Sequence, residues 1–547
     1  MGDRSHARSS PQAVNDRRAG REGLTGAEAL LETAAGRGVS VCFANPGTTE
    51  MPLVTALDRK PGLRAVLGLH ENVCTGAADG YARIARRAAL TLLHLGPGLA
   101  NGLANLHNAR RAHSPIVNVV GDHASWHLPF DAPLTSDIAA LAGTVGTHHE
   151  IRDRAAIVAT TRRAVDDAHE RGGVSTLVVP ADFQQQVAQE PPRDERPRPA
   201  PARGIDIDAI EQAARRVRDA GSRAVLLIGG DGLSCTGQRA AARIAAATGA
   251  VLYSETFPAR AERGGGLPPI DRLPYFPEAA VRALGHATAV VLAGAREPIA
   301  YFGYEGTPSR LAPQGSVQPL ANVGEDVERA LVMLAELVGG KDPQRYAGPP
   351  TAGLPTAGLP TAEPEPDAVL TGQTVGAALA RWLPENAIVS IEGGTCGYPF
   401  HTASANAVPH TVLTNTGGAI GQGLPTALGA AIAAPERPVI ALQSDGSGLY
   451  TAQALWTMAR ESVDVVVLIA ANHAYNVLRT ELARHGSAEP GPQATRLTSL
   501  GEPAIDWAAL ARGFGVPAST AATVGELRGA FTTALQARGP HLVQMMM

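Results

Sequence analysis

Short apolar runs alternate with stretches of helical spacing over most of the chain. Runs rich in valine, isoleucine and leucine occur, for example, at 116–121, 175–179, 439–442 and 465–470, with helical patterns between them. Because a strand–helix–strand unit normally joins two parallel strands, this alternation predicts parallel sheets covered by helices. The expected fold class is therefore α/β, with doubly wound parallel sheets.

The same pattern predicts the remaining strands, and capping residues predict the first helix. Thr25 is suited to cap a helix over 25–38, with Glu28 at the capping-box position. Further strands are expected at 39–43, 64–68, 90–95, 224–228, 289–293, 387–391, 411–414 and 541–544.

Two Pro-rich segments and a polar N-terminal stretch divide the chain into three predicted α/β domains. Residues 1–22 are polar and rich in arginine, which predicts a disordered tail. Segments 191–203 and 341–366 predict linkers, and the second contains the repeat TAGLPTAGLPTAEPEP, which can form no core. The expected domains are residues 23–190, a central Rossmann-like domain at 204–340, and residues 367–547.

Composition narrows the class of protein without identifying it. The chain has 547 residues, 44% hydrophobic and 18% charged, as in ordinary globular proteins. A net charge of −4 gives no reason to expect nucleic acid or an anionic membrane as a partner. No apolar run approaches a membrane span, and the first residues lack the apolar core of a signal peptide. Four scattered cysteines indicate a reducing compartment, so a cytoplasmic location is expected.

Polar residues follow two neighbouring strands predicted near the C-terminus. The run at 439–442 ends in Ser-Asp-Gly-Ser at 444–447, and the run at 465–470 is followed by Asn472. Parallel strands of one unit end at the same edge of a sheet, so Asp445 and Asn472 are expected side by side. Their oxygens suit Mg²⁺, which takes the rest of its shell from phosphates and water. The alternative is an ordinary Asp-Gly turn and a capping asparagine.

Two other motifs stand at predicted strand ends. Gly-Gly-Asp-Gly at 229–232 looks like a nucleotide loop but lacks the full Rossmann spacing, so no dinucleotide is expected there. Glu71 opens a predicted helix that continues through Ala-Asp-Gly-Tyr-Ala-Arg at 78–83. A carboxylate at a helix start is commonly a cap or a dipole partner, and that is the simplest interpretation of Glu71 alone.

Taken together, these motifs resemble those of thiamine diphosphate (ThDP) enzymes, from about residue 24 to 543. The stretch from Asp445 to Asn472 resembles the family's diphosphate motif, Gly-Asp-Gly closing on Asn-Asn, with Ser444 and Ala471 as departures. Glu71 and the sequence after it resemble the family's activating glutamate, which hydrogen-bonds the cofactor's pyrimidine N1′. The likeness is greatest to the acetolactate synthase and benzoylformate decarboxylase branch.

The resemblance implies a role for each matching residue. The first domain would bind the pyrimidine and the third the diphosphate and Mg²⁺. Gly417 to Pro425 looks like the loop under the thiazolium, with the Gly418 carbonyl accepting from the 4′-amino group and Ile420 imposing the bent cofactor shape. The implied metal ligands are Asp445, Asn472 and the carbonyl of Ala474; the implied cofactor-binding residues are Gly394, Thr395, Gly418, Ile420, Asp445, Gly446, Ser447 and Asn472.

The substrate side is a hybrid of the two enzyme types. Gly-Pro-Gly at 96–98 matches acetolactate synthases, whereas His94 stands where benzoylformate decarboxylase has a catalytic histidine. A histidine there is suited to proton transfer, and the alternative is a structural, hydrogen-bonded histidine. Thr48 resembles the decarboxylase's substrate-binding hydroxyl, Phe302 replaces its second histidine, and Asn101 is a further substrate-binding candidate.

The resemblance implies decarboxylation of a 2-oxo acid, with the product either protonated or joined to a second carbonyl. Because Glu71 and Asp445 lie on different domains that face each other across subunits in the family, a homodimer or homotetramer is implied. No flavin signature is visible at 204–340, so FAD is not expected. Two alternatives remain. One is a ThDP enzyme acting on an acyl-CoA or sulfonate. The other is a catalytically degenerate binding or regulatory homologue, an alternative that the departures at Ser444 and Ala471 favour and that the presence of Glu71 opposes.

Overall fold

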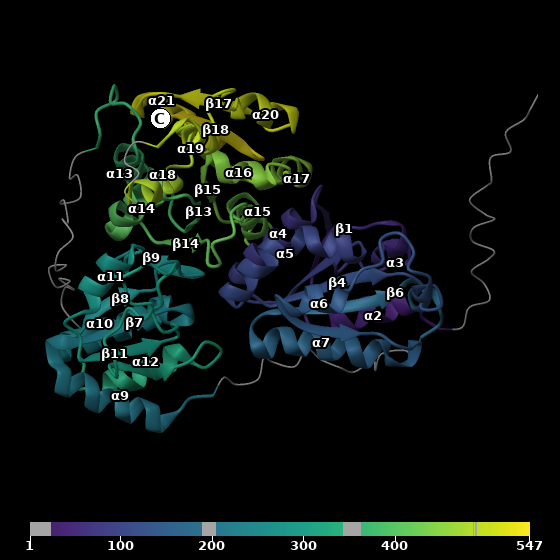
Figure 1. Ribbon diagram of the computed structural model, residues 1–547, viewed down its shortest axis with the longest axis horizontal. Coiled ribbons are helices and arrows are strands. Elements are labelled where there is room, and N and C mark those ends of the chain that lie inside the picture. The colour runs from purple at the N-terminus through teal and green to yellow at the C-terminus, as the bar shows by residue number, and fades with distance from the viewer. Residues whose placement is uncertain (1–22, 189–203, 343–362, 485, 487–489) are drawn as a thin grey trace, which may run out of the picture.

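Three sheets, each flanked by helices, make up the described part of the chain (Figure 1). The computed structural model describes residues 23–188, 204–342, 363–484, 486 and 490–547. The predicted tail and the linker at 191–203 lie outside these residues, as does most of the linker at 341–366. None of the helices in the described ranges combines the length and apolar character that a membrane crossing requires.

The first sheet has six strands in the order β2-β1-β3-β4-β6-β5, all parallel, and lies at the right of Figure 1. Its strands are β1 Val41–Asn45, β2 Arg64–Leu67, β3 Ala89–Leu93, β4 Ile116–Asp122, β5 Gly146–Glu150 and β6 Val174–Pro180. Its helices are α2 Gly26–Gly36, α3 Met51–Leu57, α4 Glu71–Ala85, α5 Leu95–Ala112, α6 Ile138–Gly143, α7 Ile157–Arg171 and α8 Ala181–Gln185.

The second sheet has five parallel strands in the order β10-β8-β7-β11-β12. Its strands are β7 Ala224–Ile228, β8 Val251–Ser254, β10 Asp271–Arg272, β11 Ala289–Ala293 and β12 Val317–Ala321. Its helices are α9 Ile207–Ala220, α10 Cys235–Thr248, α11 Pro277–Leu284 and α12 Val327–Leu337.

The third sheet has seven strands in the order β17-β18-β16-β15-β13-β14-β9. Its strands are β13 Ala387–Glu392, β14 His410–Thr414, β15 Val439–Ser444, β16 Val465–Ala471, β17 Ala518–Ala521, β18 His541–Met546 and β9 Arg260–Arg263. Its helices are α13 Gly372–Trp382, α14 Gly394–Ala403, α15 Gly423–Ala433, α16 Asp445–Gly448, α17 Ala454–Glu461, α18 Asn476–Arg484, α19 Pro492–Thr498, α20 Trp507–Gly513 and α21 Val524–Gln536.

The prediction of an α/β fold with parallel sheets is confirmed, with one irregularity. Strand β9 comes from the stretch predicted as the central domain, yet it pairs antiparallel with β14 at the edge of the third sheet. No strand is expected there from the sequence, because its four residues Arg-Ala-Glu-Arg are mostly charged. The stretch that forms the second sheet thus contributes one strand to the edge of the third sheet.

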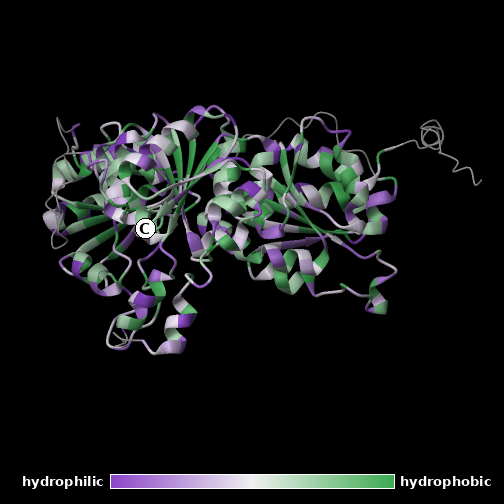
Figure 2. Cartoon of the chain, turned by 90° about the horizontal axis from the view of Figure 1, so that it is seen from above, coloured by the Kyte–Doolittle hydropathy of each residue, from purple (hydrophilic) through white to green (hydrophobic). Residues whose placement is uncertain are grey.

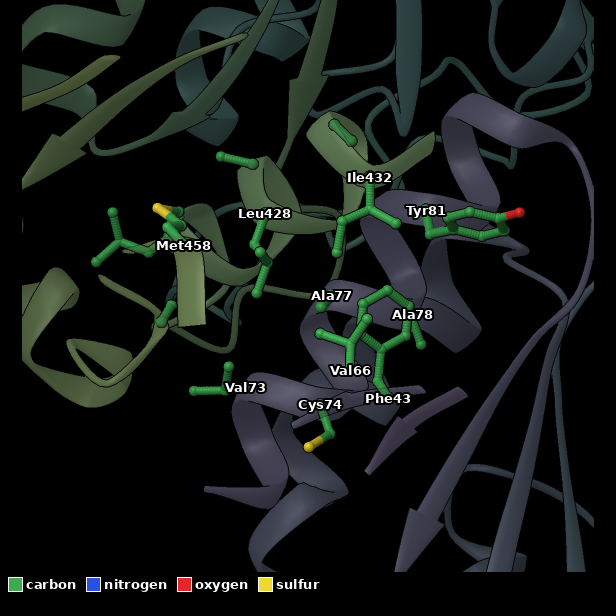
Figure 3. Close-up of a cluster of buried hydrophobic side chains, with 14 of the residues drawn as sticks. Phe43, Val66, Val73, Cys74, Ala77, Ala78, Tyr81, Leu428, Ile432 and Met458 are labelled. Carbon is green, nitrogen blue, oxygen red and sulfur yellow. The ribbon is translucent and has the colours of Figure 1, made fainter. Parts of the chain in front are cut away.

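A shared apolar core joins the first and third sheets through helices α4 and α15. Figure 3 shows Val73, Cys74, Ala77 and Ala78 of α4 near Leu428 and Ile432 of α15, and these side chains belong to one buried cluster. Figure 2 shows the matching pattern, with hydrophobic residues concentrated on strands and both colours on most helices.

The two helices approach each other closely because small residues stand at the crossing. A Cβ on Gly80 would lie 2.2 Å from the Thr426 carbonyl oxygen, and one on Gly429 would lie 1.9 Å from the Ala77 carbonyl oxygen. Only glycine permits backbones to pack at this separation. Since α4 begins at Glu71 and α15 follows the loop ending at Gln422, this crossing sets the two segments relative to each other.

Candidate functional site

Asp445 and the Asn472 turn meet at the carboxyl edge of the third sheet. Strands β15 and β16 run parallel with Ser444 opposite Ala470, so both end at the same level. The Asp445 carboxylate accepts from the backbone N–H of His473 at 2.7 Å and of Gly446 at 2.8 Å. Burial raises the pKa of Asp445, and these two backbone donors oppose that rise. The structure thus brings together the two segments that the strand pattern pairs.

The turn after β16 presents the amide of Asn472 to a second loop. His473 has a left-handed φ of 53°, which turns the chain sharply after Asn472. The Asn472 side chain accepts from the Ala474 N–H at 3.1 Å and donates to the Thr395 hydroxyl at 3.2 Å. Thr395 stands in the first turn of α14, directly after Gly394. Strands β13, β15 and β16 therefore contribute one residue group each to a single edge.

The donor set at this edge fits a hard divalent cation. Asp445 offers a carboxylate, Asn472 an amide oxygen and Ala474 a backbone carbonyl, and Mg²⁺ prefers such oxygen ligands. Within the described ranges no group of three or more His, Cys, Asp and Glu residues gathers in a way that could hold a metal. A site with one carboxylate and neutral oxygens leaves coordination positions to a phosphate-bearing partner, as Mg²⁺ commonly does.

The residues around Asp445 are tightly packed. Gly446 lies against the Tyr475 ring, where a Cβ would be 2.6 Å from a ring carbon. Gly393 has a φ of 125°, and a Cβ there would lie 1.9 Å from the Ser444 hydroxyl oxygen. The Ser447 hydroxyl accepts from the Gln443 amide at 2.6 Å, so it is already engaged inside the fold.

A buried carboxylate, Glu392 at the start of the stretch that resembles the diphosphate loop, has a role that the sequence did not predict: it anchors the glycine loop at 415–423. Glu392, at the end of β13, accepts from the backbone N–H groups of Gly421 and Gly423, each at 2.7 Å. The Gln443 amide also donates to the Glu392 carboxylate at 3.1 Å, and burial raises the pKa of Glu392. Gly418 and Ile420 project from this anchored loop, with Gly418 exposed at φ 80° and Ile420 half-buried. The only sequence signal was an acidic residue at a predicted strand end.

Helix α5 carries three asparagines on one face, of which one contacts Glu71 and two connect the first sheet to the same loop. Asn101 donates to the Glu71 carboxylate at 3.1 Å. Asn105 donates to the Gly421 carbonyl at 3.1 Å, and Asn108 donates to the Ala419 carbonyl at 2.8 Å. Their spacing places them on one helix face, so helical periodicity is the signal that could have identified Asn105 and Asn108.

Glu71 is buried but does not cap its own helix. The cap is His70, whose imidazole accepts from the Asn72 N–H at 3.1 Å. Glu71 is 8% exposed, and its Oε2 accepts from Asn101, whereas its Oε1 has no hydrogen-bond partner among the described residues. Glu71 is therefore not the helix cap, although it lies in the first turn, where a carboxylate interacts favourably with the helix dipole.

The sequence that follows Glu71 forms a buried polar bridge between the first and third sheets. Asp79 is fully buried and accepts from Arg83 at 2.6 Å and from the Gln422 amide at 2.7 Å. Arg83 also donates to the Thr414 carbonyl at 2.7 Å. The motif at 78–83 thus fixes α4 against the glycine loop, which is a structural role.

His94 is paired with a second carboxylate that the sequence analysis did not single out. Its Nδ1 lies 2.8 Å from the carboxylate of Glu50 and 3.2 Å from the Thr49 hydroxyl. Glu50 is fully buried and also accepts from the Gly47 N–H at 2.8 Å. With Glu50 accepting from Nδ1–H, the imidazole presents Nε2 as its free nitrogen. A glutamate two residues after Thr48 was the available signal in the sequence.

The predicted substrate residues lie in different places. A Cβ on Gly98 would touch both the Glu71 carboxylate, at 3.4 Å, and the His94 Cβ, at 3.5 Å, so these two side chains flank one helix turn. Thr48 is exposed near His94, whereas the hydroxyl bonded to the imidazole belongs to Thr49. Phe302, 57% exposed, lines a separate cleft of about 980 Å³ that includes Gly418 but not Glu71 or His94.

The site residues thus form two groups within one chain. One group, around Glu71 and His94, stands at the carboxyl edge of the first sheet. The other, around Asp445 and Asn472, stands at the carboxyl edge of the third sheet, and its hydrogen-bond partners all belong to that sheet and its loops.

Comparison with known proteins identifies relatives of the whole chain. The family model "Thiamine pyrophosphate enzyme, N-terminal TPP binding domain" matches residues 24–156, and "Thiamine pyrophosphate enzyme, C-terminal TPP binding domain" matches residues 393–545. A Mycobacterium tuberculosis protein provisionally named acetolactate synthase large subunit IlvX is 46% identical over 95% of this chain and 99% of its own. Benzoylformate decarboxylase of Pseudomonas aeruginosa is 29% identical over 94% of this chain and 98% of its own.

A solved structure supports the fold independently. The thiamine diphosphate-dependent 4-hydroxybenzoylformate decarboxylase of Rhodococcus jostii RHA1 superposes with a TM-score of 0.80. The match covers 96% of this chain and 99% of the other, at 24% sequence identity.

Proposed function

This chain belongs to the thiamine pyrophosphate enzyme family, and we propose that it uses ThDP and Mg²⁺ to decarboxylate a 2-oxo acid. The product is either released after protonation or joined to a second carbonyl compound. The observation that carries the proposal is the hydrogen bond from His473 to Asp445, which sets Asp445 and Asn472 side by side within the stretch matched by the C-terminal TPP binding domain.

In this proposal the third sheet holds the charged end of the cofactor. Asp445, Asn472 and the Ala474 carbonyl bind Mg²⁺, and Gly394, Thr395, Gly446 and Ser447 line the diphosphate. When bound, ThDP supplies the electron sink that loss of CO₂ from a 2-oxo acid requires. The Gly418 carbonyl would accept a hydrogen bond from the cofactor's amino group, and Ile420 would support the cofactor from below. Glu392 keeps this loop in position through its two backbone bonds.

The first sheet provides the proton-transfer groups. Glu71 would exchange a proton through Oε1 with the pyrimidine ring, because Oε2 is held by Asn101. His94 moves a proton at Nε2, since Glu50 retains the Nδ1 proton. Thr48, Asn101 and Phe302 are the proposed substrate contacts.

We propose a dimer or tetramer, because the likeness to thiamine pyrophosphate enzymes implies that domains of different subunits face each other. One chain has Glu71 on the first sheet and Asp445 on the third, and a complete site needs both around one cofactor. We propose that each site combines the first sheet of one subunit with the third sheet of another. Sedimentation should therefore detect an oligomer whose dissociation abolishes activity.

We propose that the protein uses no FAD, because residues 204–340 carry no flavin signature. The purified protein is expected to be colourless. A yellow preparation with flavin absorbance would contradict this and would favour the synthase side of the branch.

A second candidate function has one observation in its favour. The cleft that reaches Gly418 is lined by Arg86, Arg111 and Arg296, which would suit an anionic acyl donor such as an acyl-CoA or a sulfonate. A degenerate binding homologue is the third candidate, and buried Glu71 with an unpaired oxygen argues against it, because a non-catalytic copy has no chemical need for that carboxyl group.

The test is CO₂ release from a panel of aliphatic and aromatic 2-oxo acids, with ThDP and Mg²⁺ added and the products identified by mass. The proposal predicts CO₂ release that requires both additions. Acyl-CoA or sulfonate turnover without release from any 2-oxo acid would favour the second candidate. ThDP binding without turnover of any substrate would favour the third.

A further inference from the structure

A small internal cavity lies where the second and third sheets meet. Its volume is about 10 Å³, close to the space of one water molecule. Arg272 reaches it from β10 of the second sheet, Arg263 from β9 of the third sheet, and His401 from α14. The other lining residues are Leu233, Gln238, Ser254, Pro258, Ala261, Glu262 and Val412. None of the proposed ThDP or substrate residues lines this cavity.

The walls of the cavity carry buried donors without acceptors. The Nε of Arg263 and the Nε and Nη2 of Arg272 are buried and have no hydrogen-bond partner among the described residues. In the same part of the chain neither nitrogen of the His401 imidazole has a partner, and His401 is 8% exposed. Arg263, 9% exposed, uses its other two nitrogens on the carbonyls of His401 at 2.7 Å and Ile270 at 3.4 Å. Leaving buried donors unsatisfied costs about 1–3 kcal/mol each, and more for charged groups.

Both arginines keep their charge, although Arg263 is buried and Arg272 is half-buried. Burial lowers the pKa of Arg263 to about 9 and of Arg272 to about 10, and both values stay above neutral pH. Burial and the two arginines hold the pKa of His401 well below its usual value, so its imidazole is neutral and can donate one N–H. Neither arginine forms a salt bridge with any described residue.

Nearby carboxylates do not balance this charge. Glu262 is bound by Arg260 at 2.8 Å and by the Thr411 hydroxyl at 2.8 Å. Asp271 interacts with Arg263 only at longer range, since no hydrogen bond joins them. With three arginines on β9 and β10 and these two carboxylates, the junction carries one excess positive charge. An unpaired buried charge is strongly unfavourable, so a counter-ion is the expected solution.

We propose that this cavity binds one small monovalent inorganic anion of the halide class, represented by chloride. An anion accepts hydrogen bonds from several N–H donors at once and also cancels the excess positive charge. A water molecule can accept hydrogen bonds but cannot cancel the charge. The cavity admits an ion little larger than water and excludes sulfate or phosphate. The bound ion ties β10 to β9 and α14, and so stabilises the junction of the second and third sheets.

Thermal unfolding of the full-length protein tests the proposal. The protein is dialysed into sodium gluconate, then compared with sodium chloride and sodium bromide at the same ionic strength. A ligand that binds only the folded state raises the unfolding midpoint with its concentration, here by about 2 °C or more between low and high millimolar halide. In Arg272→Met the unfolding midpoint should no longer differ between halide and gluconate. Arg243→Met, which loses bonds to the Gly340 carbonyl and does not line the cavity, should keep this difference.

Equal midpoints in gluconate and halide for the parent protein would overturn the proposal, as would an unchanged halide effect in Arg272→Met. Should Arg272→Met fail to fold, crystals of the parent protein grown with bromide decide the matter. An anomalous bromide peak between Arg263, Arg272 and His401 would support the site. Density for water alone, without anomalous signal, would overturn it.

Discussion

Replacing Gly80 by alanine is expected to push α4 and α15 apart and to damage both stability and activity. The added Cβ would lie 2.2 Å from the Thr426 carbonyl oxygen and 2.7 Å from the Thr426 Cα, both backbone atoms that cannot rotate away. Reaching the 3.4 Å of ordinary contact requires a shift of about 1.2 Å between the helices. Overpacking of this kind costs about 1–3 kcal/mol, and misplacement of about 1 Å at a catalytic site can cost about 10²-fold in rate.

Gly529→Ala is the matched control for this change. Gly529 lies in α21 with nothing within 4 Å of its added Cβ, so alanine there should stabilise the helix by about 0.8–1 kcal/mol. In urea unfolding followed by circular dichroism, the unfolding midpoint of Gly80→Ala should be lower than that of the parent protein, and the midpoint of Gly529→Ala should be higher. The rate of CO₂ release should fall by about 10²-fold only for Gly80→Ala. Equal unfolding midpoints for the two variants would refute the close helix crossing.

Three further changes test individual residues. Asp445→Ala should lose ThDP affinity as well as activity, because the metal holds the diphosphate; unchanged binding by calorimetry would reject this metal site. Glu50→Gln should lower kcat by up to about 10²-fold and change the His94 tautomer seen by ¹⁵N NMR; an unaltered spectrum would show that the two side chains are not coupled. Burial raises the pKa of Glu255 from 4.5 to about 7, so the folded state holds this proton more tightly than the unfolded chain. The contribution of this proton to the free energy of unfolding is fully present below pH 4.5 and is lost as pH rises through 7. Relative to Glu255→Gln, the parent protein should therefore lose up to about 3 kcal/mol of its free energy of unfolding over that range. Parallel curves of stability against pH for the two proteins would contradict this.

Local patterns were sufficient to predict the strands that precede Asp445 and Asn472. The runs before Asp445 and Asn472 are apolar and β-branched, and buried parallel strands require such runs. Parallel pairing then makes the two ends adjacent without further information. The match to the C-terminal TPP binding domain covers the same stretch.

Contacts between distant segments could not be predicted in this way. Strand β9 is short and charged, and its pairing with β14 depends on the tertiary arrangement rather than on its own sequence. The partners of Glu50 and Glu392 come from segments far away or from backbone groups, which residue identity does not reveal. The interpretation of Glu71 as a helix cap failed for a local reason, since His70 takes the capping position first.

The central claim is that Glu71 activates ThDP, and the most direct test is hydrogen–deuterium exchange at C2 of the bound cofactor. Glu71→Gln keeps the size of the side chain and can still meet Asn101, but it cannot exchange a proton with the pyrimidine. Quenched samples analysed by NMR should show C2 exchange slower by about 10²–10⁴-fold, equivalent to about 3–5 kcal/mol of barrier. ThDP affinity should be retained, because the proposed diphosphate and metal residues lie on the third sheet. Exchange in Glu71→Gln as fast as in the parent protein would contradict the account.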